Sequence, residues 1–176
     1  MKMQPKDICP AVILMGVSGC GKSTFGFFLQ REFGYEFKDG DDLHPPINVA
    51  KMSRGRALDD DDRAPWLEAI CEQIKTNIEA QKPVVIACSA LKRRYRDALR
   101  SATDHLKFIH LLASQDAISK RLCQREGHYM PPGLLPSQFA ALESTAEEAD
   151  VIDIDVEQHL LDIERQILDA VKVSPA

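Results

Sequence analysis

The chain has 176 residues, of which 44% are hydrophobic and 28% charged, and its 22 basic and 27 acidic side chains give a formal net charge of −5. A chain of this length and composition is expected to form one domain around a hydrophobic core, which excludes collagen-like, low-complexity and disordered classes. Its acidic balance argues against a nucleic-acid partner, so any bound anion is expected to meet a local basic cluster.

The cysteines and the hydrophobic runs bear on the cellular compartment. The five cysteines are odd in number and form no Cys-x-x-Cys pair, so neither a disulfide framework nor a zinc site is predicted. The apolar run near the N-terminus covers only Ala11–Met15, which is too short for a signal peptide or a membrane span. We therefore expect a cytoplasmic protein without a membrane partner.

Short hydrophobic or alternating runs predict five strands, and the longer segments between them have helical spacing. The strands are expected at Ala11–Met15, Tyr35–Lys38, Val84–Cys88, Lys107–Leu112 and Val151–Ile154. Alternation of strands with helices favours a parallel sheet that is covered on both faces. The fold predicted from this pattern is a three-layer α/β domain, and the absence of a linker or repeat indicates that residues 1–176 form a single unit.

Three helices are expected from the spacing of apolar residues and from their end signals. Thr24–Glu32 is compatible with a helix after the first strand. A second helix is expected from Ser114 to Gly127, because glycine tolerates the left-handed conformation of a C-cap. The last helix is expected to begin near Asp155 and to cover one sheet face with Leu160, Ile163, Ile167 and Val171.

The first strand leads into a glycine-rich segment, Gly16–Ser23, that fits the pattern G-x-x-x-x-G-K-[ST] and precedes a helix. Glycines allow backbone N–H groups to converge on phosphate oxygens, and the helix N-terminus adds positive partial charge. Lys22 is expected to reach the β- and γ-phosphates as a catalytic residue, and the Ser23 hydroxyl to bind Mg²⁺. The alternative is an ordinary glycine turn. The nucleotide-binding residues predicted from this loop are Gly16, Val17, Ser18, Gly19, Cys20, Gly21, Lys22, Ser23 and Thr24.

A phosphate loop does not separate a kinase from a nucleotide-driven switch. Signalling GTPases usually carry Asp-x-x-Gly and Asn/Thr-Lys-x-Asp segments, and neither pattern occurs in this sequence. A small-molecule phosphotransferase is therefore favoured, and an ATP-hydrolysing regulator is the alternative from another functional class.

The second predicted strand ends in the segment Asp39–Pro45, which contains three carboxylates and an imidazole. Ligands of open α/β sheets bind at the carboxyl ends of the strands. Phosphoryl transfer needs one carboxylate to accept the proton of the attacking hydroxyl and another near Mg²⁺, so we expect Asp41 to act as base and Asp39 to bind the metal. His44 is a substrate-binding candidate or a residue that stabilises the turn. The structural alternative is an acidic turn that caps the next helix.

The chain resembles the gluconate kinase (gluconokinase) family of P-loop kinases. Six blocks carry the resemblance: Gly16–Ser23, Asp39–Pro45, Asn48–Gly55, Leu58–Leu67, Cys88–Asp97 and Arg121–His128. The resemblance implies ATP-dependent phosphorylation of D-gluconate to 6-phosphogluconate, which feeds the pentose phosphate pathway. It also implies Mg²⁺, a homodimer, and a nucleoside-monophosphate-kinase-like fold with five parallel strands in the order 2-3-1-4-5. A shikimate-like or nucleoside-monophosphate kinase is the alternative among enzymes.

Basic residues cluster after the third strand, where a sugar acid could meet positive charge. Lys92 and Arg96 lie four residues apart beside the apolar stripe of a predicted helix, so both are predicted to bind substrate. Arg93 and Asp97 are expected to form a solvated ion pair. For Arg94 and Arg100 a position on the solvent face is favoured.

Residues 45–67 are expected to cover the acceptor, with a short helix that ends at Gly55 and leaves Lys51, Arg54 and Arg56 to meet an anion. The acidic run Asp59–Asp62 is interpreted as the start of a helix, because negative charge is favoured there. Trp66 and Leu67 are expected to pack in the core, with a stacking role for Trp66 as the alternative.

Arg121 and Arg125 are predicted to bind the nucleotide phosphates from a lid at about residues 121–136, with Arg121 stabilising charge in the transition state. The alternative is that both lie on a basic surface helix. The turn at 153–158 is expected to contact adenine, as in related folds. One feature departs from the family pattern: no apolar strand ends in an aspartate that would support the magnesium ion, and Asp39 is assigned that role in its place.

Overall fold

The structure is a computed structural model of the chain and describes residues 7–123 and 134–173. Five parallel strands form one sheet in the order β2-β3-β1-β4-β5. The strands are β1 (Ala11–Met15), β2 (Glu36–Asp39), β3 (Val84–Ala87), β4 (Leu106–Leu112) and β5 (Val151–Asp155). Each agrees with its predicted range to within one residue, and the predicted fold class and strand order are confirmed.

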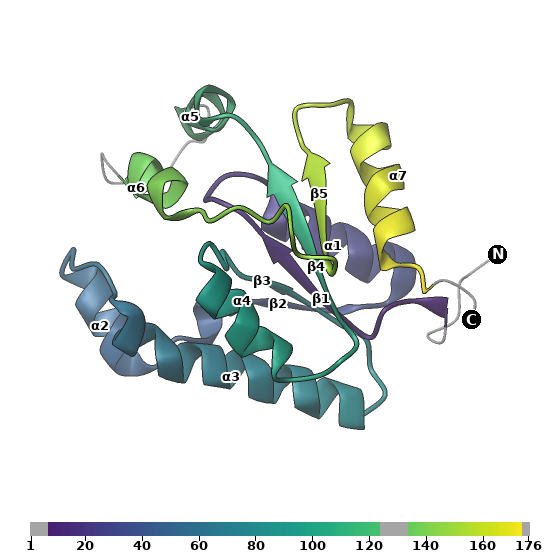
Figure 1. Cartoon of the computed structure of the whole chain (residues 1–176), viewed down its shortest axis with the longest axis horizontal. Helices are drawn as coiled ribbons and strands as arrows, with labels where there is room; N and C mark the ends of the chain where they lie inside the picture. The colour runs from purple at the N-terminus through teal and green to yellow at the C-terminus, as the bar shows by residue number, and fades with distance from the viewer. Residues whose placement is uncertain (1–6, 124–133, 174–176) are drawn as a thin grey trace.

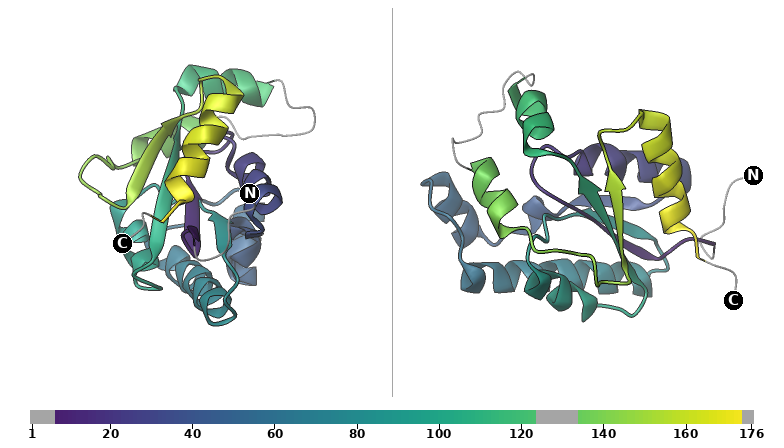
Figure 2. Two further views of the ribbon diagram at one scale, coloured as in Figure 1. Left: turned by 90° about the vertical axis from the view of Figure 1, so that its right-hand side faces the viewer. Right: turned by 45° about the horizontal axis from the view of Figure 1, so that its top comes forward.

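Helices connect the strands and lie on both faces of the sheet (Figures 1 and 2). Helices α1 and α7 cover one face, and α3 and α4 cover the other. The remaining helices α2, α5 and α6 lie toward the end of the molecule at which the strands finish. The helices are α1 (Lys22–Phe33), α2 (Pro46–Ser53), α3 (Asp60–Glu79), α4 (Arg93–Arg100), α5 (Gln115–Cys123), α6 (Leu134–Ala141) and α7 (Leu160–Val171), with the 3-10 helix η2 (Gly40–Leu43) after β2.

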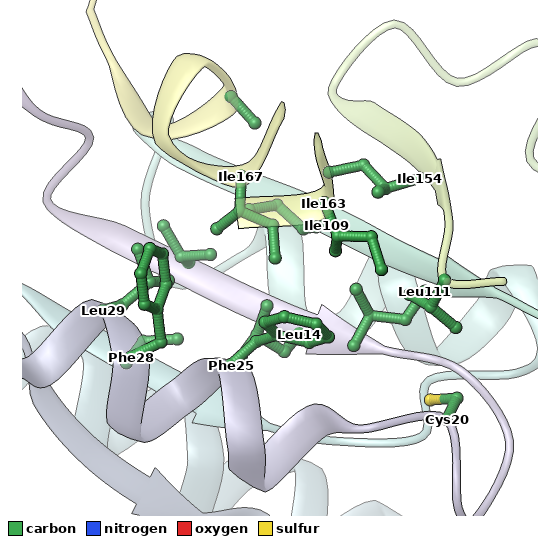
Figure 3. Packing of buried hydrophobic residues seen from close by; sticks show 14 of the residues in the cluster. Leu14, Cys20, Phe25, Phe28, Leu29, Ile109, Leu111, Ile154, Ile163 and Ile167 are labelled. Atoms are coloured by element: carbon green, nitrogen blue, oxygen red, sulfur yellow. The ribbon is translucent and has the colours of Figure 1, made fainter. Parts of the chain in front are cut away.

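The fully buried strand β1 explains the two-sided core. Side chains alternate between the faces of a strand, so Val12 and Leu14 join one hydrophobic cluster while Ile13 and Met15 join the other. Figure 3 shows the first cluster, in which Leu14 lies between the aromatic residues of α1 and the isoleucines of α7. Burial on both faces makes β1 a fixed support for the glycine loop that follows it.

Helix α3 begins with the acidic run that the sequence interpretation assigned to a helix start. The Asp59 side chain accepts from the Asp62 N–H at 2.8 Å, and the Asp62 side chain accepts from the Asp59 N–H at 2.9 Å. This reciprocal capping satisfies two N–H groups that have no partner within the helix. The predicted helix start is therefore confirmed.

The last helix starts later than predicted. Helix α7 begins at Leu160 after the N-cap His159 rather than near Asp155, and helix α4 begins at Arg93 after its extended N-cap Lys92. The described part of α5 extends to Cys123, and its predicted end at Gly127 lies outside the described residues. None of the helices in the described part of the chain has the length and apolarity that crossing a membrane requires.

Candidate active site

The glycine loop connects the end of β1 to the start of α1 at Lys22. Gly16, Gly19 and Gly21 all have positive φ angles, of 134°, 83° and 104°. A Cβ atom at Gly16 would lie 2.8 Å from the Leu111 carbonyl oxygen and 2.9 Å from the Cys20 sulfur, so only glycine fits there. The 12-residue helix α1 begins directly after the loop without an acidic side chain in its first turn. Its N-terminus therefore fits a phosphate group.

The Lys22 side chain folds back over this loop. Its Nζ donates to the carbonyl oxygens of Gly16 and Val17, at 2.9 Å each. The Cys20 sulfur lies 3.9 Å from the same Nζ, but its side chain is completely buried, and this burial raises the pKa of the thiol. Cys20 therefore contributes packing to the loop, while the Lys22 ammonium group lies against its first residues.

Three charged residues converge at the carboxyl end of β3. Cys88 follows that strand, and burial raises the pKa of its thiol to about 12. The charges of Lys22, Asp41 and Asp39 all act on this thiol. Strands β1 and β2 both pair in parallel with β3, so Lys22 at the start of α1, Asp39 at the end of β2 and Asp41 in η2 all lie at the edge of the sheet where these strands end.

The environment of Asp41 suits a proton acceptor. Desolvation by the surrounding protein, together with the nearby Asp39 carboxylate, raises the pKa of Asp41 above its ordinary value, while His44 and Lys22 act in the opposite direction. The Asp41 backbone N–H donates to the Asp39 Oδ1 at 3.0 Å, which fixes the turn that presents the Asp41 carboxyl. A carboxyl with a raised pKa holds a proton more readily, as general-base catalysis requires.

Ser23 and Asp39 line one cavity, with a volume of about 530 Å³. A hydroxyl and a carboxylate offer the hard oxygen ligands that Mg²⁺ takes. Within residues 7–123 and 134–173, no group of three or more His, Cys, Asp or Glu side chains could hold a metal ion. This donor set fits Mg²⁺, which usually keeps waters and phosphate oxygens in its coordination sphere and needs one or two protein carboxylates.

His44 is held by an aromatic neighbour. Its ring stacks on Trp66 with centroids 4.4 Å apart and planes inclined by 12°. The buried Trp66 donates from Nε1 to the Gly40 carbonyl oxygen at 2.7 Å, so its predicted core position is confirmed and it also stacks. Burial lowers the pKa of His44, which favours the neutral ring.

The two lysines predicted to bind substrate are both held by the first turn of α3. The Lys92 Nζ lies 2.9 Å from the Asp60 Oδ1, and the Lys51 side chain forms an ion pair with Asp62. These aspartates raise the pKa of each lysine. The exposed Arg54 lies just beyond α2, as its C-cap. The structure thus brings Lys51 and Lys92 to the same acidic turn.

Arg121 lies near the loop that follows β5. Its Nη2 donates to the Val156 carbonyl oxygen at 2.5 Å, and Glu157 in the same loop accepts from the Ser114 N–H at 2.6 Å. The structure therefore connects α5 with the turn that was expected to contact adenine. Arg125, the other arginine assigned to the phosphates, lies outside the described residues, as does most of the predicted lid.

Comparisons with known proteins identify the family. Residues 12–148 match the family model described as an AAA domain. Three similar relatives are a gluconokinase of Gluconobacter oxydans (45% identical, over 84% of this chain and 83% of the relative), a thermosensitive gluconokinase of Escherichia coli (42%, over 90% and 86%) and a probable gluconokinase of Mus musculus (40%, over 93% and 98%). The chain belongs to the gluconokinase family. A crystal structure of a gluconokinase from Sinorhizobium meliloti superposes with a TM-score of 0.83 at 43% identity and covers 93% of this chain and 92% of that one.

The position of Arg96 corrects one prediction made for this gluconokinase-family chain. Arg96 is fully buried, and each of its three nitrogens donates to the protein. Its Nε lies 3.0 Å from both Glu148 carboxylate oxygens, and its Nη1 donates to the Ala90 and Leu91 carbonyl oxygens. Arg96 therefore stabilises the fold, and the prediction that it contacts substrate is wrong.

Two further predictions about this basic cluster are also wrong. Asp97 pairs with Arg100 at 2.6 Å rather than with Arg93. Arg100 is not on a purely solvated face, because it also donates to Asp150 at 2.7 Å and to Glu148. The ion pairs tie α4 to the segment before β5, which lies far away in the sequence.

Sequence reasoning missed one residue that contacts the glycine loop. The Gln138 Oε1 on α6 accepts from the Ser18 N–H at 2.7 Å, and its Nε2 donates to the Ser18 Oγ at 3.0 Å. The two residues are 120 positions apart, and no local spacing pattern relates them. Only the tertiary structure of this family member brings them together.

Proposed function

We propose that this protein transfers the terminal phosphoryl group of ATP to D-gluconate, giving ADP and 6-phospho-D-gluconate. The observation that carries the proposal is the convergence of Lys22, Asp39 and Asp41 at one edge of the sheet, in a chain whose relatives at 40–45% identity are named gluconokinases. It supports the proposal because the proposed phosphate-binding loop and a carboxyl with a raised pKa belong to the same edge of the sheet.

In the proposed reaction, Asp41 orients the primary hydroxyl of gluconate and accepts its proton. The hydroxyl oxygen forms a bond to the γ-phosphorus while the bond from that phosphorus to the β–γ bridging oxygen breaks, which leaves ADP. Lys22 and the loop N–H groups stabilise the negative charge on the phosphoryl oxygens. Asp41 therefore acts on the attacking hydroxyl, and Lys22 acts on the phosphoryl group that is transferred.

We assign Mg²⁺ to Ser23 and Asp39, and the proposal is supported by their common cavity. When bound, the ion supplies positive charge beside the phosphate oxygens. We also propose that Arg121 and Arg125 contribute charge to the nucleotide phosphates. The hydrogen bond from Arg121 to Val156 is compatible with a position at the nucleotide side of the sheet edge.

The carboxylate of gluconate requires a cation, for which Lys51, Arg54 and Lys92 are the proposed residues. Lys51 and Lys92 are partly exposed, with 29% and 34% of the side-chain surface accessible, and each ammonium group is paired with an aspartate in the first turn of α3. His44, fixed against Trp66, is proposed to contact the polyol. Arg96 has no place in this set, because it is buried and bonded to Glu148.

An ADP-release assay tests the function with gluconate, shikimate and nucleoside monophosphates as separate acceptors. We expect stimulation by gluconate and formation of 6-phosphogluconate. If gluconate does not change the basal rate of ADP release, the proposal is refuted and an ATP-hydrolysing regulator is favoured. The family resemblance further supports a single-domain cytoplasmic homodimer, for which sedimentation analysis should give twice the chain mass of 19.7 kDa.

A further inference from the structure

The Gln138 side chain accepts a hydrogen bond from one peptide group of the glycine loop, the group that carries the Ser18 N–H. Its carboxamide makes two hydrogen bonds to Ser18, one to the backbone N–H at 2.7 Å and one to the hydroxyl at 3.0 Å. Two bonds to the same residue fix both the position and the rotation of the carboxamide. A single bond would leave it free to rotate.

The same peptide group is held at its other end by the lysine of the loop. The Ser18 N–H and the Val17 carbonyl belong to one peptide unit, and the Val17 oxygen accepts from the Lys22 Nζ at 2.9 Å. Gln138 thus holds the direction in which this planar unit faces, and the unit supplies one of the two carbonyl oxygens that hold the Lys22 ammonium group, the other being that of Gly16. The lysine of such a loop reaches the β- and γ-phosphates, so this peptide lies at the terminal-phosphate end of the loop.

The packing of α6 does not depend on this carboxamide. Leu135, one turn before Gln138, is buried in the cluster formed by α1, α7 and the sheet, and Phe139 and Leu142 pack against the same cluster. These apolar contacts anchor α6, which lies near α5 at the end of the molecule where the strands finish (Figures 1 and 2). Helix α6 is therefore held in place by apolar contacts, and the hydrogen bonds of Gln138 to the loop are not required for this.

We propose that Gln138 is a positioning residue for phosphoryl transfer. By holding the Val17–Ser18 peptide, it places the Lys22 ammonium group for contact with the terminal phosphate of the nucleotide. The transfer itself rests on the proposed kinase function, whereas the effect on nucleotide binding does not depend on the acceptor. Misplacement by about 1 Å of a group that positions reactants can lower turnover ~10²-fold, so the loss of Gln138 is expected to be measurable.

The decisive variant is Gln138→Leu, which keeps the bulk and the helix propensity of the side chain but removes both hydrogen bonds. We expect kcat to fall by roughly 10- to 100-fold while the KM for gluconate changes less than about 3-fold. Gln166→Leu is the matched control. Gln166 lies on α7, and its carboxamide contacts only Gln158 and the Asp162 carbonyl among the described residues, so this variant should behave as the wild type.

A binding experiment separates this proposal from the kinase proposal. The affinities for ADP and for a non-hydrolysable ATP analogue are measured by calorimetry. Gln138→Leu should lower the affinity for the analogue by at least about 3-fold more than the affinity for ADP. This result would support the positioning role even if gluconate were not the acceptor. Equal weakening of both nucleotides, or a kcat within twofold of the wild type, would overturn the role. A loss of kcat that only matches the loss of folded protein, measured by thermal unfolding, would overturn it as well.

Discussion

The buried ion pair between Arg96 and Glu148 allows the sharpest test of how this fold is held together. The Arg96 side chain is fully buried and that of Glu148 is 3% exposed. The two nearby arginines, Arg96 first, lower the pKa of Glu148 from 4.5 to about 2. The lowered pKa means that the folded chain favours the charged carboxylate, so the ion pair stabilises the fold at neutral pH. Removing one partner of a buried pair costs about 3–5 kcal/mol.

Glu148→Gln keeps the size of the side chain but removes its charge, so Arg96 stays charged without its counter-ion. We expect unfolding by urea at pH 7 to show a loss of about 3 kcal/mol. In a chain of this length, that loss corresponds to a decrease in Tm of about 6–12 °C. A double variant, Arg96→Met with Glu148→Leu, should recover most of the loss, because apolar residues of similar volume often replace a buried pair without cost.

The pH dependence of this loss follows from the direction of the pKa shift. The folded-state pKa of Glu148 is lowered, so its contribution is fully present above pH 4.5 and disappears as the pH falls toward 2. The difference between the wild type and Glu148→Gln should therefore shrink across this window. A difference below about 1 kcal/mol at pH 7, or one that does not change between pH 5 and pH 2, would refute the reasoning.

Three further outcomes are expected. Asp41→Asn should bind ATP in calorimetry but lose ~10²–10⁴-fold in turnover, and unchanged turnover would limit Asp41 to shaping the turn. Because the pKa of Asp41 is raised, kcat/KM for gluconate should decline as the pH falls through a value above 3.8, and a decline only at or below 3.8 would contradict this assignment. Gly16→Ala should abolish ATP binding in calorimetry, since its Cβ would lie 2.8 Å from the Leu111 oxygen; retained affinity would show that the loop can shift.

The glycine loop and the sheet could be predicted because both are encoded locally. The loop pattern directly follows the apolar run of β1, and the burial of β1 on both faces is visible as an uninterrupted hydrophobic segment. The convergence of Asp39 and Asp41 on this loop also followed from the sequence, because the carboxyl ends of parallel strands share one edge.

The role of Arg96 could not be predicted from the helical pattern alone. Helical spacing places it beside the apolar stripe of α4, where both a cleft and a buried partner are compatible with a guanidinium group. Its partners Glu143, Ser144 and Glu148 come from a segment about 50 residues later. No local rule indicates that this segment returns to cover α4. The contact of Gln138 with Ser18 was missed for the same physical reason.

The acidic run Asp59–Asp62 at the start of α3 has a structural role and a proposed functional role at the same time. Asp59 and Asp62 cap the helix, while Asp62 and Asp60 in the same turn pair with basic residues of two other segments. Lys51 reaches it from α2, and Lys92 reaches it from the N-cap of α4, where Tyr95 also donates to Asp60. The chain has a net charge of −5, so a free lysine side chain could contact many acidic groups. The ion pairs with α3 instead hold each of these two lysines in one position. The acidic first turn of α3 therefore also positions the two lysines proposed to attract a sugar acid.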